Sequence, residues 1–328
     1  MVSLTTAATL LVGFLGLVLL VKGAQTAVGA SIRLAKHYDV PDALVGVTIV
    51  AIGTSLPEVG ANVIASFGIL SGTLDPAVAS ATVLGGNMGS TITQQLLLFG
   101  IFLLGFGHYH PSARFVRWTL LPMVAASILV LVLALDGHLS RAEGGILLVG
   151  YAAYTYHAIS TRERSAVPPE PASRHVWRDV GITVLGLAAV LVGAFVVLEV
   201  VETVVDQLAL GGSMIGLVTI GLAAALPELS TVLEALRRRT PDLAIGTLVG
   251  SNIVNPLLAI GLGSAISTYQ VPEAVVVWDL PVRVVAGVGI LAWLRFVSGG
   301  SLGRREGLYL VVAYLVFVSG RLLLFAGQ

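Results

Sequence analysis

The stretch LVGVTIVAIGTSLPE, residues 44–58, is apolar for most of its length but ends with two hydroxyl side chains, a leucine, a proline and a glutamate. A second stretch, MIGLVTIGLAAALPE at residues 214–228, ends with the same Leu-Pro-Glu. The matching positions are Gly46, Leu56, Pro57 and Glu58 in the first stretch and Gly216, Leu226, Pro227 and Glu228 in the second. The two stretches are therefore interpreted as copies of one motif, in which a proline and a carboxylate interrupt an apolar segment.

A further matching segment follows each copy. LGGNMGSTITQ at 84–94 aligns with IGTLVGSNIVN at 245–255. The shared residues are Gly85, Gly89, Ser90 and Ile92 in the first segment and Gly246, Gly250, Ser251 and Ile253 in the second. Because both matches occur in the same order, the sequence predicts an internal repeat, with motif regions at 44–95 and 214–263.

The composition indicates an integral membrane protein. Hydrophobic residues make up 56% of the 328 residues and charged residues only 11%, whereas a soluble domain carries about 25% charged residues. The formal net charge is zero, which gives no indication of a nucleic-acid partner. The chain has no cysteine, so disulfides and thiol chemistry are excluded. The partner that the composition predicts is the lipid bilayer.

The apolar runs predict transmembrane helices. Crossing roughly 30 Å of hydrocarbon takes about 20 apolar residues, and the backbone in lipid must satisfy its own hydrogen bonds. Ten runs fit this rule, at residues 4–34, 41–67, 77–107, 116–135, 141–159, 179–207, 212–236, 242–267, 276–294 and 305–325. These runs are too long and continuously apolar for barrel strands. The run at residues 4–34 has no basic residue before its apolar core and no signal-peptide cleavage site, so it is expected to be a retained transmembrane span and not a cleaved signal peptide.

One long polar segment divides the chain. TRERSAVPPEPASRHVWR at 161–178 is rich in proline and charge, as linkers are. It separates residues 1–160 from residues 179–328, each with five predicted spans. Because five is odd, the second half must enter the membrane inverted. The predicted fold is an all-α membrane protein of ten transmembrane helices in two inverted five-helix repeats.

Basic residues predict the orientation of these spans. With ten spans, all but four of the 18 basic residues fall on one side, which contains the linker. The four exceptions are Lys22 within the first span and, on the other side, Arg141, Arg283 and Arg321. The side rich in basic residues is expected to be cytoplasmic. The protein would then be a multi-pass protein of the cell membrane with both termini extracellular.

The repeated proline and glutamate predict a cation site. Proline has no N–H, so Pro57 leaves the carbonyl of Gly53 without its helical donor, and Pro227 does the same for Ala223. An intramembrane carboxylate costs several kcal/mol unless it is paired or used. Two carboxylates, freed carbonyls and amide oxygens would form an all-oxygen cage that suits Ca²⁺. Softer metals are disfavoured because no cysteine and no nearby histidine is offered.

These motifs resemble the calcium/cation antiporter superfamily, in particular its prokaryotic Na⁺/Ca²⁺ exchanger branch, whose repeats carry GTSLPE followed by GN-x-x-GSNI-x-N/D. GTSLPE is intact at 53–58. The resemblance implies exchange of Ca²⁺ or a similar divalent cation for Na⁺ by alternating access, with spans one and six sliding against the rest. The ion ligands that it implies are Glu58, Glu228, Thr54, Ser55, Ser90, Ser251, Gln94 and Asn255, with main-chain carbonyls from Ala51 and Gly221 onward.

The second repeat departs from the family pattern. It reads Ala224 and Ala225 where the family has a threonine and a serine. The loss of two oxygens brings Na⁺ coupling into question and keeps a proton-coupled exchanger as the alternative, because a carboxylate in a low dielectric readily takes a proton. Ser230 and Thr231 follow the second glutamate, but such side chains in transmembrane helices commonly bond their own backbone.

Two other classes of protein compete with an antiporter. A cation channel would use the same oxygens without coupling and is the less favoured alternative. An intramembrane hydrolase would need paired aspartate motifs or a cluster of metal ligands, which the sequence lacks. We therefore expect no enzymatic activity, no catalytic residues and no cofactor, and only transported Ca²⁺ with Na⁺ or H⁺.

Overall fold

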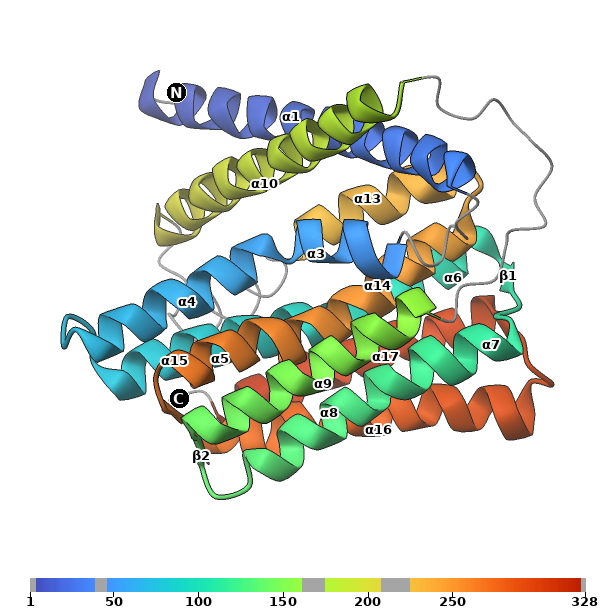
Figure 1. The fold of residues 1–328 in the computed structure, drawn as a ribbon. Coiled ribbons are helices and arrows are strands. Elements are labelled where there is room, and N and C mark those ends of the chain that lie inside the picture. Colours follow the sequence, from blue (N-terminus) through green and yellow to red (C-terminus); the bar gives the residue numbers. More distant parts are fainter. Residues whose placement is uncertain (1–3, 39–45, 161–174, 208–224, 326–328) are drawn as a thin grey trace.

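The computed structural model describes residues 4–38, 46–160, 175–207 and 225–325. Nearly all regular structure in these ranges is helical (Figure 1). The helical elements of the first half are α1 (Leu4–His37), η1 (Gly46–Val50), α3 (Ala51–Thr54), α4 (Leu56–Leu70), α5 (Pro76–Ile92), η2 (Thr93–Leu98), α6 (Phe99–Phe106), α7 (Ala113–Phe115), η3 (Val116–Leu120), α8 (Leu121–Leu133) and α9 (Arg141–Ser160). The elements labelled η are π-helical stretches that continue into neighbouring α-helices.

The second half is also mostly helical in its described ranges. Its helical elements are α10 (Val176–Gln207), α13 (Leu226–Arg237), α14 (Pro241–Val254), η5 (Asn255–Ile260), α15 (Gly261–Ile266), η6 (Val275–Asp279), α16 (Leu280–Ala292), η7 (Trp293–Val297) and α17 (Arg304–Leu324). Most of the predicted linker lies outside the described residues, and α10 begins at Val176, slightly before the predicted span.

The helices confirm a mostly helical membrane protein. Within the described ranges, seven helices are long and apolar enough to cross a membrane, and the bent pair Gly46–Thr54 and Leu56–Leu70 makes up to eight. The predicted spans at 141–159 and 212–236 are not among them. Helix α9 carries Arg141 and Glu143 in its first turn, and only the end of the other span is described, as α13. The count of ten spans stays a prediction.

Packing between the two halves is reciprocal. Strand β1 (His108–Tyr109) pairs antiparallel with β4 (Leu302–Gly303), and β2 (His138–Leu139) pairs antiparallel with β3 (Tyr269–Gln270). Each two-stranded ribbon thus contains one strand from each half. The helices also pack between the halves, since α17 of the second half packs on α6 of the first, and α9 of the first half packs on α15 of the second. Neither half therefore closes its core alone.

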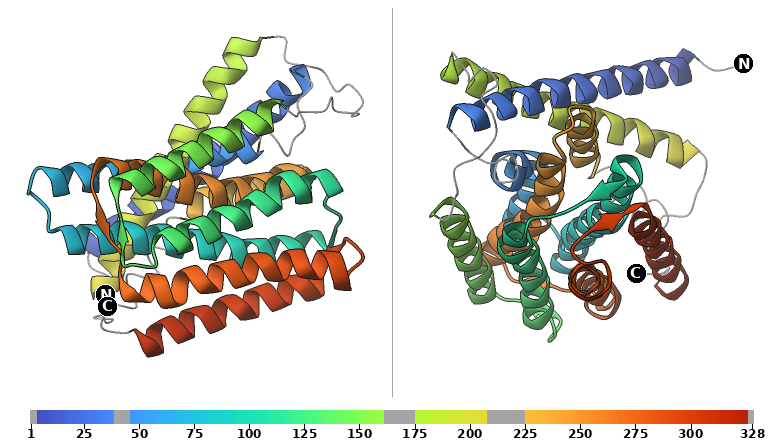
Figure 2. Two further views of the ribbon diagram at one scale, coloured as in Figure 1. Left: turned by 60° about the horizontal axis from the view of Figure 1, so that its bottom comes forward. Right: turned by 90° about the vertical axis from the view of Figure 1, so that its right-hand side faces the viewer.

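Helices α1 and α10 form a separate pair that lies across one side of the remaining bundle (Figures 1 and 2). Glycines allow their close approach. A Cβ atom on Gly23 would lie 2.7 Å from the Val190 nitrogen, and one on Gly186 would lie 2.7 Å from the Ala27 nitrogen. An ion pair of 2.7 Å between Arg33 and Asp179 also joins the two helices.

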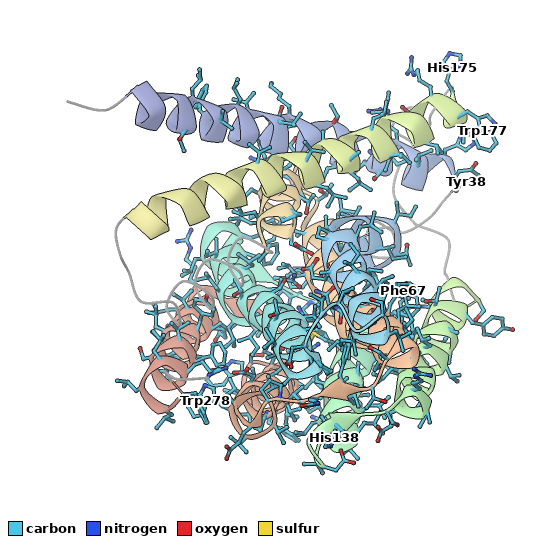
Figure 3. The ribbon with its side chains drawn as sticks, turned by 90° about the vertical axis from the view of Figure 1, so that its left-hand side faces the viewer. Tyr38, Phe67, His138, His175, Trp177 and Trp278 are labelled. Atoms are coloured by element: carbon cyan, nitrogen blue, oxygen red, sulfur yellow. The ribbon has the colours of Figure 1, made fainter. Side chains whose placement is uncertain are left out.

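Large apolar side chains cover much of the outer surface, as expected for contact with lipid. Examples are Val149 on α9, Phe296 on η7 and Leu323 on α17, which are 70%, 79% and 83% exposed. Figure 3 shows Trp177 and Tyr38 at the same end of the α1–α10 pair. Aromatic side chains of this kind are common where a membrane meets water.

Candidate functional site

Both Leu-Pro-Glu motifs begin a helix. Ser55 precedes α4 with φ −85° and ψ 2°, and Ala225 precedes α13 with φ −89° and ψ −2°. A proline occupies the second position of each helix, and each glutamate lies in the first turn. Before α4, the helix axis bends by 51°. This break occurs because Pro57 cannot donate to the preceding turn.

The two glutamates are buried and lie within electrostatic range of each other. Glu58 is 6% exposed and Glu228 is fully buried. The Ser90 hydroxyl donates a 2.9 Å hydrogen bond to Glu58 Oε1. Among the described residues, the second oxygen of Glu58 and both oxygens of Glu228 have no hydrogen-bond partner. Three carboxylate oxygens are therefore available to a ligand.

Hydroxyl and amide groups from both halves surround these carboxylates. Glu228 faces Thr54 and Ser251, whose hydroxyl oxygens lie 3.5 Å apart. Glu58 faces the side chain of Asn255, whose amide atoms have no hydrogen-bond partner within the described ranges. Each glutamate thus meets a serine of its own half and a second polar residue of the other half.

A chain of side-chain amides links the helices behind the carboxylates. Gln94 Nε2 donates to the Ser90 hydroxyl at 3.1 Å, and Asn252 Nδ2 donates to Gln94 Oε1 at 3.2 Å. Asn87 Nδ2 donates to the main-chain oxygen of Asn255 at 3.2 Å. The first bond lies within α5–η2, whereas the bonds from Asn252 and Asn87 cross between α5–η2 and α14–η5 and fix the relative position of the two halves at the site.

Glycines bring the main chains of the two halves together beside this cluster. A Cβ atom on Gly46 would lie 2.5 Å from the Leu243 oxygen, and one on Gly250 would lie 2.7 Å from the Val47 Cα atom. The glycine of the second Gly-Ser pair therefore has a packing role, while Ser251 beside it faces Glu228. Packing and site formation use adjacent residues of one motif.

The structure brings together most of the predicted ligands. Thr54, Glu58, Ser90, Gln94, Glu228, Ser251 and Asn255 form one buried cluster. Ser55 lies at the break, fully buried, and its hydroxyl has no hydrogen-bond partner in the described part of the chain. The carbonyl of Ala51 already accepts from the Thr54 hydroxyl at 3.3 Å and from the Ser55 nitrogen at 3.1 Å. Gly221 lies outside the described residues.

In the second half, the residue directly before the Leu-Pro-Glu motif offers no side-chain oxygen. Ala225 occupies the position that corresponds to Ser55 and is 1% exposed, and Ala224 lies outside the described residues. Ser230 donates to the Pro227 oxygen at 2.8 Å, and Thr231 donates to the Glu228 oxygen at 2.9 Å. Both hydroxyls therefore bond their own helix, as expected for such residues.

Sequence reasoning missed three residues of this region. Asn252 bridges to Gln94, and Asn62 donates to the main-chain oxygen of Glu58 at 2.8 Å. Arg283 donates to the Asn252 carbonyl and is completely buried, so it does not lie at the outer membrane surface, where the sequence had predicted it.

The sequence did contain a signal for Asn252. Pro256 follows Asn252 by four residues and leaves the Asn252 carbonyl without a helical donor, as the other prolines do for their own partners.

The chain is similar to known membrane transport proteins. The sequence model of the family described as sodium/calcium exchanger protein matches residues 8–160 and 179–323. The putative antiporter CaxA of Alkalimonas amylolytica is 29% identical over 313 residues, which cover 92% of this chain and 94% of CaxA. The sodium/calcium exchanger MaX1 of Methanosarcina acetivorans is 25% identical, with 94% of this chain and 97% of MaX1 covered.

The fold is also similar to solved structures. A structure of the sodium-calcium exchanger NCX_Mj superposes with a TM-score of 0.80 and 24% sequence identity, covering 95% of this chain and 98% of the other. At this identity the likeness shows the fold, and the chemistry of the site must be argued from the residues that this chain places there.

Proposed function

The chain belongs to the sodium/calcium exchanger family, and from this premise we propose that it exchanges Ca²⁺, or a similar divalent cation, for Na⁺. The observation that carries the proposal is the pair of buried glutamates, Glu58 and Glu228, which have three oxygens without a hydrogen-bond partner among the described residues. Two buried carboxylates that interact across a site are costly unless a cation compensates their charge.

The surrounding groups favour a hard divalent cation. Four described side chains that face the two glutamates offer a hydroxyl or an amide oxygen, namely Thr54, Ser90, Ser251 and Asn255. Ca²⁺ takes 6–8 oxygen ligands in flexible geometry. Within the described ranges, no cluster of three His, Cys, Asp or Glu side chains is present, so the proposed site depends on two carboxylates and neutral oxygens. In this proposal Ca²⁺ is cargo and the protein uses no cofactor.

We further propose that the two halves are inverted repeats of five spans and that access alternates between the two sides. The matching backbone angles at Ser55 and Ala225 and the reciprocal strand pairing support this reading. The α1–α10 pair would move against the rest of the bundle, because it packs as a unit on one side. The basic residues support a cell-membrane location with extracellular termini and a cytoplasmic 161–178 linker.

Proton coupling is the second candidate. Ala225 offers no oxygen at the break in the second half, and Ser230 and Thr231 donate to their own helix. A site with fewer neutral oxygens holds Na⁺ less well, while its carboxylates still bind protons. This observation favours H⁺ over Na⁺ as the ion that is exchanged for Ca²⁺.

The test is Ca²⁺ uptake into proteoliposomes that contain the purified protein. An outward Na⁺ gradient is compared with an outward H⁺ gradient at matched ionic strength, and protein-free vesicles give the background. Uptake driven by Na⁺ supports the first proposal, and uptake driven only by H⁺ supports the second. Ca²⁺ uptake at a rate that does not depend on either gradient would contradict an antiporter and favour a channel. The absence of uptake under every gradient would contradict Ca²⁺ transport.

A further inference from the structure

Arg283 on α16 is a fully buried cation close to the candidate ion site. Its Nη2 donates a 2.6 Å hydrogen bond to the main-chain oxygen of Asn252. Its Nε and Nη1 have no hydrogen-bond partner in the described part of the chain, and no described carboxylate forms an ion pair with it. Arginine stays protonated in proteins, so a permanent positive charge lies inside the bundle without a direct counter-charge.

The carbonyl that Arg283 caps is one that the sequence sets free. In an α-helix the carbonyl of Asn252 would accept from the nitrogen of residue 256, but Pro256 has no N–H. The sequence predicts that carbonyls freed in this way bind cations beside the two glutamates. At this carbonyl the partner is the Arg283 guanidinium.

The positive charge lies at one end of a set of hydrogen bonds that leads toward Glu58. Arg283 donates to the main-chain oxygen of Asn252, the side-chain amide of Asn252 donates to Gln94, Gln94 donates to Ser90, and Ser90 donates to Glu58. The three bonds from the Asn252 side chain to Glu58 run in one direction, and hydrogen bonds aligned in this way polarise one another in a low dielectric. The guanidinium therefore lies beside the residue that starts this chain, and its positive potential acts on the carboxylate through the low-dielectric interior.

We propose that Arg283 is a resident cation of the ion site, one that is never exchanged and that sets the affinity for the transported ions. The inference depends on the proposed function, since it assumes that Ca²⁺ and Na⁺ bind at Glu58 and Glu228. With Arg283 in place, the two glutamates and the guanidinium carry a net charge of minus one instead of minus two when no ion is bound. Bound cations are held more loosely and can be released.

The charge of the transported ion gives the proposal a quantitative signature. Repulsion from a fixed charge is proportional to the charge of the mobile ion. Removing the charge of Arg283 should therefore tighten Ca²⁺ binding by the square of the factor that applies to one Na⁺ ion. For the partly screened repulsion between the guanidinium and one Na⁺ ion, we expect removal of the charge to tighten Na⁺ binding about threefold. Because Ca²⁺ carries twice the charge, its binding should tighten about tenfold.

The experiment measures Ca²⁺ and Na⁺ binding to purified full-length protein by calorimetry. Arg283→Gln removes the charge but keeps an amide donor, and Arg283→Lys keeps the charge. We expect the glutamine variant to bind both ions more tightly with the stated ratio, and the lysine variant to resemble the wild type. Gln95→Met is the matched control, because Gln95 Nε2 donates to the main-chain oxygen of Arg283 at 3.1 Å. The substitution removes a buried hydrogen bond to the same residue without changing charge, and should leave the affinity for both ions unchanged.

Each outcome bears on the inference. Unchanged or weaker Ca²⁺ binding in folded Arg283→Gln would overturn it, as would equal effects of glutamine and lysine, which indicate a structural role alone. If Arg283→Gln fails to fold, Pro256→Ala is added, because alanine returns an N–H that can bond to the Asn252 carbonyl. The double variant should then show the same relation between the gains in Ca²⁺ and Na⁺ affinity. Failure of the double variant to fold would contradict the proposal that Arg283 replaces the missing donor to this carbonyl. If the wild type binds no Ca²⁺, the proposed function itself fails.

Discussion

The hydroxyl of Ser90 donates a 2.9 Å hydrogen bond to Oε1 of Glu58, although the two residues lie on different helices, α5 and α4. The same serine oxygen accepts from Gln94 at 3.1 Å. Ser90 therefore holds one carboxylate oxygen in place and leaves the other, which has no hydrogen-bond partner in the described ranges, free to coordinate. It is a positioning residue for the proposed ion site.

Ser90→Ala should weaken Ca²⁺ binding by about ten- to 150-fold, because hydrogen bonds to charged groups contribute about 1.5–3 kcal/mol and every 1.4 kcal/mol is about tenfold. The measurement is Ca²⁺ binding to purified protein. Ser264→Ala serves as the control, since Ser264 is also fully buried but donates to its own helix at the Ile260 oxygen, 2.7 Å away. A Ca²⁺ affinity that is equal in the two variants would contradict the role given to Ser90.

Glu58→Gln should abolish divalent transport and leave the fold intact. The amide keeps the size of the side chain but removes the charge that compensates Ca²⁺, and a buried cation without its counter-charge is strongly disfavoured. Ca²⁺ flux into proteoliposomes and thermal unfolding check the two parts. Glu273→Gln, at an exposed position, should transport normally, and wild-type flux in the Glu58 variant would refute the site.

Ala225→Ser should strengthen Na⁺ binding. Ala225 has nearly the same backbone angles as Ser55, so a serine there restores one oxygen to the second break. One added neutral ligand contributes about 0.5–1.5 kcal/mol, or roughly two- to tenfold in Na⁺ affinity. The measurement is the Na⁺ concentration that half-maximally drives Ca²⁺ uptake.

The control for this serine is Ala235→Ser, further along α13 at a position that is also 1% exposed. It adds the same hydroxyl to the same helix but away from the break, and should leave Na⁺ dependence unchanged. A similar gain in both variants would show that the position of the hydroxyl is irrelevant.

Gly186→Leu should destabilise the α1–α10 pair. A Cβ atom at Gly186 would lie 2.7 Å from the Ala27 nitrogen and 2.8 Å from the Thr26 hydroxyl, so a leucine forces the helices apart. Overpacking of this kind costs about 1–3 kcal/mol, seen as a lower midpoint of thermal unfolding in detergent. Gly181→Leu on the same helix meets open space and should unfold like the wild type.

Much of the fold was predictable because membrane helices follow local rules. The predicted spans at 77–107, 242–267, 276–294 and 305–325 differ from the described helices by a few residues at each end. Apolar length determines these elements, since a lipid-exposed backbone must satisfy its hydrogen bonds within one segment. The sequence also indicated where the first motif breaks, because the effect of a proline on the preceding turn is local.

The site was only partly predictable because its contacts join distant segments. Repetition of Leu-Pro-Glu identified Glu58 and Glu228, but no local pattern showed that Asn252 would bond to Gln94. Arg283 shows the limit most clearly. The sequence predicted it on the outer side of the membrane, and only the packing of α16 places its guanidinium at the carbonyl of Asn252.

The sequence by itself determined that this chain is helical, embedded in a membrane and built around two proline-broken motifs with a glutamate each, because composition, span length and proline chemistry act within one segment. Only the tertiary structure decided which oxygens lie beside each glutamate and where the buried positive charge lies. Those depend on how α5, α14 and α16 pack against one another, and packing between helices depends on side-chain shape across the whole fold.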